Sequence, residues 1–254
     1  MAKQSEPRNY PSLEYVRRLV ASIVPRNEID MRDRALISFL LLSGMRDQAI
    51  ASLPLSCINE DERLIVQNPR LGVRTKFSKL IPTTLFAFDD EMLGFVIAWV
   101  KHLKAKGFGS QDPMFPRAKL DQGKDNLSFE SSTEVEPVYW NGAGRIRDIL
   151  KKRAQQAGLS YFPPHTFRHL AINLAFKACR TGEEIKAISQ NFGHEHIAPT
   201  VTIYGNYTSS RLAEIIKEMD FSGRQEPTVK DEIRELKRLI AARSNLSKQG
   251  QTNE

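Results

Sequence analysis

The order of apolar and polar residues along the chain predicts a mostly helical protein. Apolar residues recur at helical spacing over residues 12–24, and again from about residue 30 to a stop at Gly44. A short helix should follow and end before Pro54, where the sequence breaks the pattern. A longer helix is expected over residues 89–107, opened by aspartate and closed by lysine and glycine.

The second half of the chain continues in helices. The pattern predicts them over residues 139–158, 165–182, 181–194, 211–219 and 228–244. The last of these carries apolar residues along one side and many charges, so it should pack on a partner or remain partly free.

Two segments break the helical pattern. Residues 57–88 contain short β-favouring runs separated by turn residues, which predicts a small antiparallel sheet of two or three strands. Residues 107–138 show no sustained period and much Gly, Pro, Ser and Asp, so we expect a long irregular loop. The expected fold class is therefore α+β, mostly α-helical, with a small antiparallel β-sheet between helices.

Composition narrows the kind of partner. Lys and Arg outnumber Asp and Glu by 37 to 30, and the pI is about 9.4, which suits DNA, RNA or an anionic membrane surface. The two cysteines, Cys57 and Cys179, form no metal-ligand or disulfide pattern. The N-terminus lacks a signal peptide's apolar segment, and the longest apolar run is too short for a bilayer. We expect a soluble cytoplasmic protein without a bound metal or cofactor.

The motif HTFRH places two candidate catalytic residues on one helical face. His165 and Arg168 are three residues apart and follow two prolines, after which a helix can start. A capping histidine and a surface arginine would look the same in an isolated motif. Together, however, an arginine fork and a histidine proton donor suit a phosphodiester.

Two further basic residues precede this motif. Arg46 follows a glycine at a helix end, and Lys76 lies near the tip of the predicted β-hairpin, where an ammonium group could reach into a groove. Each could instead be an ordinary solvated side chain. Arg74 and Lys79 are neighbours that could replace Lys76 in its role.

The stretch NFGHEHIAPTVTIYGNYT holds two histidines and two tyrosines between predicted helices. His194, His196, Tyr204 and Tyr207 could simply be polar and aromatic residues of a loop. The alternative interpretation is that one tyrosine is a nucleophile and one histidine points at the group that it attacks.

The order of these motifs resembles the tyrosine recombinase (phage integrase) family. SGMRDQAIASL is similar to its first arginine motif, HTFRH to its HxxR box, and SQNFGHEHIAPTVTIYG to its third box. The resemblance covers roughly residues 12–220, which would be the catalytic domain. Residues 1–11 would then be a linker or arm, and residues 221–254 a tail with the helix at about 228–244.

The resemblance implies a catalytic set and a reaction. Tyr204 would attack a DNA phosphorus to form a 3′-phosphotyrosyl link, and a 5′-hydroxyl would later reverse the step without metal or cofactor. Arg46 and Arg168 would neutralise the phosphorane, Lys76 would protonate the leaving 5′ oxygen, His165 would assist proton transfer, and His194 would donate to a phosphate oxygen. His196 and Tyr207 would be bystanders.

The sequence departs from the family in places. Ala49 stands where many members have an acidic residue, and the gap from His194 to Tyr204 is one residue longer than in many members. Members usually carry an N-terminal core-binding domain, whereas about a dozen residues precede the first helix here. The sequence is thus expected to be either a fragment or a short natural form.

The resemblance also implies partners, and leaves rivals open. Double-stranded DNA is the expected substrate of site-specific recombination and integration, with a free monomer, a tetramer on DNA, and no membrane association. The rivals are a type IB topoisomerase-like enzyme that reseals the same strand, a DNA-binding integrase relic with weak or no catalysis, and an RNA-binding helical domain. The last has no RNA-type motif behind it.

Overall fold

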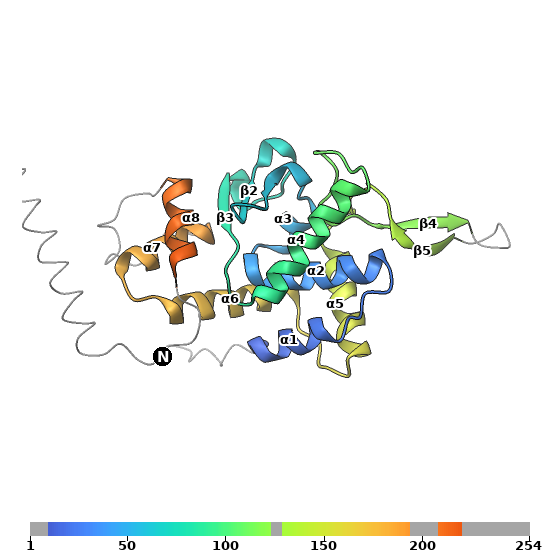
Figure 1. Ribbon diagram of the computed structural model, residues 1–254, viewed down its shortest axis with the longest axis horizontal. Coiled ribbons are helices and arrows are strands. Elements are labelled where there is room, and N and C mark those ends of the chain that lie inside the picture. Colours follow the sequence, from blue (N-terminus) through green and yellow to red (C-terminus); the bar gives the residue numbers. More distant parts are fainter. Residues whose placement is uncertain (1–9, 123–128, 194–207, 220–254) are drawn as a thin grey trace, which may run out of the picture.

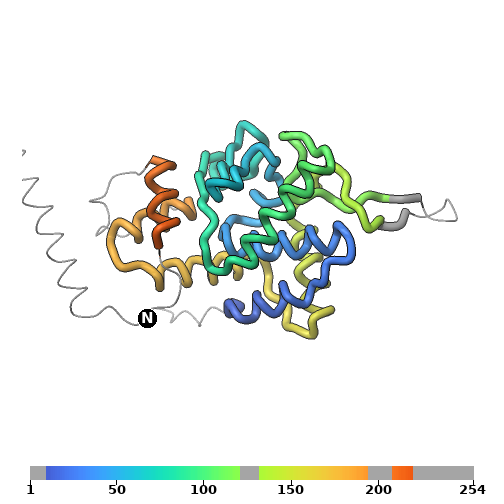
Figure 2. Tube along the Cα trace, in the orientation of Figure 1, coloured from blue at the N-terminus to red at the C-terminus, as the bar shows by residue number. Residues whose placement is uncertain are grey.

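A buried helix, α2 (Glu28–Ser43), organises the fold of the computed structural model, which describes residues 10–122, 129–193 and 208–219. From Ala35 to Ser43 every side chain of α2 is buried, so it is apolar almost all round, as a central helix should be. Figures 1 and 2 show α2 crossing the middle of the molecule, with α4 (Asp90–Ala105) and α6 (Pro164–Ala178) packed against it. One apolar core runs from α1 (Leu13–Ala21) to the last described helix.

The remaining elements cover the two ends of this core. The other α-helices of the described ranges are α3 (Asp47–Ala51), α5 (Gly144–Gln156), α7 (Gly182–Asn191) and α8 (Ser209–Glu218). Short 3-10 helices are η1 (Leu55–Cys57), η2 (Pro69–Leu71) and η3 (Lys76–Ser78). None of the helices in the described ranges is both long and apolar enough to cross a membrane.

The ends of the helices follow local sequence signals. Asn27 and Asp89 accept hydrogen bonds from the backbone at the starts of α2 and α4, and Thr181 forms a reciprocal capping box with Glu184. Gly44 ends α2 in the left-handed conformation, as its position in the sequence predicts. These helices are therefore confirmed, while the predicted tail helix at 228–244 lies outside the described residues.

The predicted small sheet is confirmed. Strands β1 (Ile58–Asn59), β2 (Leu64–Gln67) and β3 (Ile81–Thr84) pair antiparallel in the order β1-β2-β3. The helices α7 and α8 pack against β3 (Figure 1). The sheet thus joins the first half of the chain to the helices that follow HTFRH.

The expectation of an irregular loop over residues 107–138 is wrong in part. Strands β4 (Ala118–Gln122) and β5 (Phe129–Val135) form an antiparallel hairpin that projects from the body (Figure 1). A two-stranded hairpin is marginal alone, and here its base is fixed by other elements. The Val135 N–H donates to the Glu28 carboxylate at 2.7 Å, and the Val135 side chain is buried. Such support comes from residues distant in sequence, which is why periodicity missed it.

The helix predicted from residue 139 begins later, at Gly144. Tyr139 and Trp140 precede it without regular secondary structure. Trp140 is buried, and the Arg32 guanidinium lies 5.6 Å from the centroid of the Trp140 ring. Apolar residues here serve the core without being helical, so the apolar pattern alone placed the start too early.

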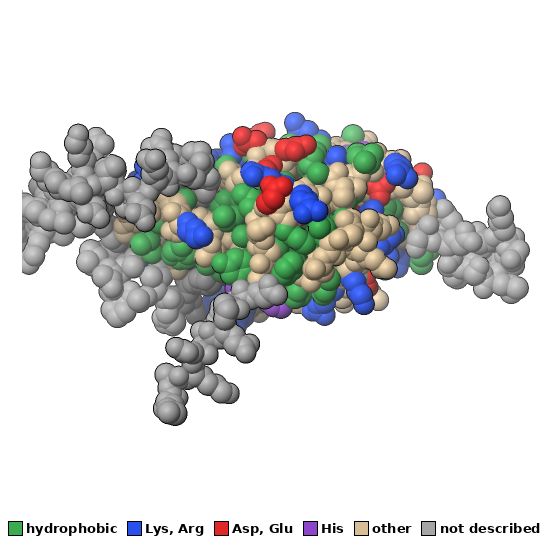
Figure 3. Space-filling view, turned by 90° about the horizontal axis from the view of Figure 1, so that it is seen from below, with side chains coloured by type: hydrophobic (Ala, Val, Ile, Leu, Met, Phe, Trp, Pro, Cys, Tyr) green, Lys and Arg blue, Asp and Glu red, His purple; other side chains and the backbone are tan. Residues whose placement is uncertain are grey.

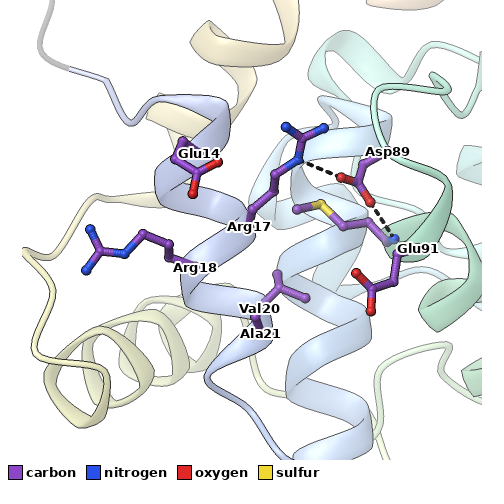
Figure 4. Close-up of a pocket in the computed structure, with 8 residues that line it drawn as sticks. Glu14, Arg17, Arg18, Val20, Ala21, Asp89 and Glu91 are labelled. Carbon is purple, nitrogen blue, oxygen red and sulfur yellow. Dashed lines mark hydrogen bonds and ion pairs between the residues drawn. The ribbon is translucent and has the colours of Figure 1, made fainter. Parts of the chain in front are cut away.

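A shallow pocket between α1 and the start of α4 also lies in the described structure (Figure 4). Arg17 Nε donates to Asp89 Oδ2 at 2.8 Å across it, and Glu14 and Glu91 also line it. None of its lining residues is a candidate catalytic residue. The ion pair links α1 to the N-cap residue of α4.

Candidate active site

Four of the six candidate catalytic residues lie in the described part of the chain. Arg168 is on α6, His165 lies in its first turn, Arg46 directly precedes α3, and Lys76 starts η3 between β2 and β3. His194 and Tyr204 lie outside the described residues, as do His196 and Tyr207.

Arg168 is held by the ends of two other helices. Its Nη1 donates to the carbonyl of Gly44 at 2.6 Å, and its Nη2 donates to the carbonyl of Phe192 at 2.9 Å. Gly44 directly follows α2 and Phe192 directly follows α7. The planar guanidinium thus joins three segments and is fixed in one orientation, which a flexible ammonium group could not achieve.

Two cationic side chains share this site. Burial lowers the pKa of Arg168, and the charge of Arg46 lowers it further, to about 10. The protein therefore holds two positive charges within electrostatic reach of one another in a partly dry place. An anion bound between them would stabilise the charged form of Arg168 and raise its pKa again. Such an arrangement suits an oxyanion such as a phosphodiester.

Gly44 permits the close packing that orients Arg168. Its φ is +55°, and a Cβ there would lie 2.3 Å from Cε1 of Phe192 and 3.3 Å from Cβ of Ala171. A side chain would therefore push Phe192 away from α2 and disturb both carbonyls that hold Arg168.

Gly44→Ala is expected to lower the free energy of unfolding by about 1–3 kcal/mol, because left-handed strain adds to the clash with Phe192. Urea denaturation measures this change. Gly94→Ala is the matched control, since Gly94 lies within α4 with open space around its Cα. The control should be neutral or stabilising by about 0.5–1 kcal/mol. Equal stability of Gly44→Ala and wild type would contradict the packing account.

Arg46 is placed by the short helix that it precedes. Its backbone is extended at the N-cap of α3, and its side chain is half-buried. The next residue, Asp47, accepts a hydrogen bond from Arg147 Nη2 of α5 at 3.2 Å. This partly exposed pair links the start of α3, beside Arg46, to α5.

Lys76 lies in the connection from β2 to β3, close to where the sequence placed it. Its side chain is exposed, and its Nζ lies 4.8 Å from the ring centroid of Phe77. The connection is fixed to the Arg46 segment, because the Arg74 N–H donates to Ser52 Oγ at 2.9 Å, directly after α3. Arg74 is exposed as well, and Lys79 lies in the same connection, so the choice among Lys76, Arg74 and Lys79 as general acid stays open.

His165 is exposed in the first turn of α6, one turn before Arg168. Its ring stands nearly perpendicular to that of His169, with 5.8 Å between the centroids. Phe167, Leu170 and Ala171 of the same helix are buried, on another side of it. His165 is therefore positioned to meet a ligand that approaches from solvent.

Asn191 is a positioning residue that sequence reasoning missed. Its buried side chain accepts from the Thr84 N–H at 2.6 Å and donates to the Thr84 carbonyl at 3.0 Å, while its own carbonyl accepts from Thr83 Oγ1 at 3.0 Å. These bonds join the end of α7 to β3. The asparagine in SQNFGHE was the available signal, since a buried polar side chain must find partners.

On the face in Figure 3, basic side chains are scattered and a small acidic group lies near one edge. Within residues 10–122, 129–193 and 208–219, no group of three or more His, Cys, Asp and Glu side chains could hold a metal ion.

Comparison with known proteins decides the family. The model of the phage integrase family matches residues 13–211, most of the chain. The chain belongs to the phage integrase family.

Two curated relatives of this phage-integrase chain are tyrosine recombinases. XerD of Pseudomonas aeruginosa is 22% identical over 203 residues, covering 79% of this chain and 58% of XerD. XerC of Corynebacterium efficiens is 27% identical over 143 residues, covering 51% of this chain and 45% of XerC. The chain thus spans about half the length of these relatives.

Solved structures share the fold of this phage-integrase chain. The XerA recombinase has a TM-score of 0.52 at 19% identity, over 88% of this chain and 67% of XerA. The integrase of mycobacterium phage Brujita has a TM-score of 0.51 at 18% identity, over 92% of this chain and 65% of that integrase. The fold is that of a tyrosine recombinase catalytic domain: mostly helical, with small antiparallel sheets.

Proposed function

We propose that this chain is a site-specific DNA recombinase or integrase that cuts and rejoins strands through a 3′-phosphotyrosyl intermediate. The observation that carries the proposal is the Arg168 site, where a guanidinium bound to two carbonyls lies within electrostatic reach of Arg46. Membership of the phage integrase family supports it. We assign residues 12–220 to the catalytic domain.

The residue types fit a metal-independent transesterification. The Tyr204 hydroxyl oxygen bonds to phosphorus as the bond from phosphorus to the 5′ oxygen breaks, and His165 assists removal of the tyrosine proton. Arg46 and Arg168 neutralise the negative charge that develops on the non-bridging oxygens, and His194 donates to one of them. Lys76 transfers a proton to the leaving 5′ oxygen. The phosphate ester is retained in the phosphotyrosyl bond, so rejoining needs no nucleotide.

The proposed partner is duplex DNA. The proposed assembly is a tetramer on DNA and a monomer when DNA is absent. A lambda integrase tetramer bound to a Holliday junction is among the solved structures that share this fold, with a TM-score of 0.50. The rival functions remain strand cleavage and resealing of the topoisomerase type, and a DNA-binding relic without cleavage.

Covalent trapping tests this function without knowledge of the target site. The chain is incubated with a library of nicked duplexes of randomised sequence, and denaturant-resistant protein–DNA adducts are recovered and sequenced. We expect adducts that disappear in Tyr204→Phe and persist in the matched control Tyr207→Phe. Exchange of strands between two recovered duplexes would separate recombination from simple resealing.

Failure to form adducts, even when the N-terminal part of a related recombinase is supplied, would overturn the enzymatic proposal. Salt-sensitive binding without any adduct would instead favour the DNA-binding relic, because phosphate contacts release counterions whether or not cleavage follows.

A further inference from the structure

An exposed phenylalanine directly follows Lys76 in the connection between β2 and β3. Phe77 is 73% exposed and has φ +59°, in the left-handed region that bulky residues rarely occupy. Ser78 follows with φ +50°. A large apolar side chain in strained backbone, facing solvent, gives nothing to the core, so its place needs another explanation.

The strained turn is held by hydrogen bonds on both sides. Thr75 Oγ1 donates to the Lys79 carbonyl at 2.7 Å, closing the turn around Phe77. On its other side, the Arg74 N–H donates to Ser52 Oγ after α3. Phe77 is thus presented on a fixed support that is joined to the Arg46 segment.

The surroundings of Phe77 are cationic. The connection from residue 68 to residue 80 has four basic side chains and no acidic one: Arg70, Arg74, Lys76 and Lys79. Lys76 Nζ and Lys79 Nζ lie 4.8 and 5.6 Å from the Phe77 ring centroid. Cation–π contacts at exposed sites are weak, so a polyanion could draw both ammonium groups to its phosphates and uncover the ring.

We propose that Phe77 is a wedge that inserts into the base step beside the scissile phosphate. Apolar side chains flanked by Lys or Arg insert in this way, and they partly unstack and kink the duplex. The inference rests on the proposed function, since it places Phe77 next to the residue that protonates the leaving 5′ oxygen. Phe77 is a positioning residue: it stacks on a base and thereby sets the path of the strand over Lys76.

Tryptophan fluorescence reads out the insertion directly. The native Trp99 and Trp140 are buried, so an added exposed tryptophan gives a separable signal. We compare Phe77→Trp with the matched control Leu80→Trp, because Leu80 is also apolar and is 58% exposed in the same connection. The probe is a duplex recovered by covalent trapping, with a mixed-sequence duplex at low salt as the second probe.

The wedge predicts strong quenching and acrylamide protection of the added tryptophan in Phe77→Trp on the recovered duplex, with little change for Leu80→Trp. Phe77→Ala should weaken binding to that duplex about tenfold, the order expected for losing one stacked base. Phe77→Gly should weaken binding equally while its melting temperature stays level or rises, because glycine adopts the left-handed backbone without strain. A role confined to folding would not give this combination.

Three results would overturn the wedge. The first is equal quenching of the two added tryptophans on DNA that the wild type binds and cleaves. The second is unchanged DNA affinity in Phe77→Ala. The third is a fluorescence signal of Phe77→Trp that depends on protein concentration without DNA, which would make this surface a contact between copies of the chain. In each of these cases the proposed function stands, whereas absence of wild-type DNA binding and adducts would remove both proposals.

Discussion

Arg168→Lys should slow formation of the covalent protein–DNA adduct by about 10²- to 10³-fold, the usual loss when one preorganised oxyanion donor is removed. Lysine keeps the positive charge, so the loss would come from geometry. The native guanidinium bonds the Gly44 and Phe192 carbonyls at once, and a single ammonium group cannot reproduce that planar fork. Arg168→Ala removes the charge as well and should be slower still.

Single-turnover kinetics on a nicked duplex separate this effect from binding. DNA affinity should fall much less than the adduct rate, because many other cations contribute to phosphate contacts. Arg17→Lys is the matched control, since Arg17 pairs with Asp89 at the pocket beside α1 and takes no part in the proposed site. An adduct rate in Arg168→Lys equal to wild type would refute the assigned role.

Asp33→Ala should lower the free energy of unfolding by about 3–5 kcal/mol, the cost of breaking a buried ion pair on one side. Asp33 is 1% exposed. Its Oδ1 accepts from Arg32 at 2.7 and 3.0 Å, and its Oδ2 accepts from Arg153 Nε at 2.8 Å. Burial alone would lower the pKa of Arg153, but the charges of Asp33 and Asp30 outweigh it and raise that pKa. Loss of Asp33 therefore leaves two buried cations poorly compensated.

Urea denaturation at neutral pH measures this change. Asp47→Ala is the control, because the pair of Asp47 with Arg147 is solvent-exposed and should contribute less than about 1 kcal/mol. The combined variant Arg32→Met, Asp33→Leu, Arg153→Met should recover much of the lost stability, since an apolar cluster avoids the desolvation cost. If Asp33→Ala is as stable as the control Asp47→Ala, the buried ion pairs of Asp33 do not contribute to the free energy of unfolding.

Some features of the fold are set by residues that are close in sequence, and others by residues that are far apart. Asn27, Asp89 and Thr181 cap their helices by bonding backbone groups three residues away, so a short stretch of sequence contains the whole signal. The β4–β5 hairpin and the late start of α5 contain no such signal. They depend on Glu28 and Arg32, more than a hundred residues earlier in the chain.

The candidate site divides in the same way. The sequence alone nominated Arg46, Lys76, His165 and Arg168, because order and spacing matched a family pattern; their catalytic roles stay predictions, as do those of His194 and Tyr204. It did not show which distant partners hold these residues. Arg168 bonds a carbonyl 124 residues away, and Asn191 bonds a strand 107 residues away.

By itself, then, the sequence predicted most helices of the described ranges, the small sheet and the family, and it nominated residue types that suit a phosphodiester. Only the tertiary structure decided the fixed guanidinium of Arg168, the buried Asp33 network and the strained, exposed Phe77. The physical reason is the distance along the sequence over which each interaction acts. Caps and periodicity act over a few residues, whereas burial, buried ion pairs and close glycine contacts arise only when distant segments pack together.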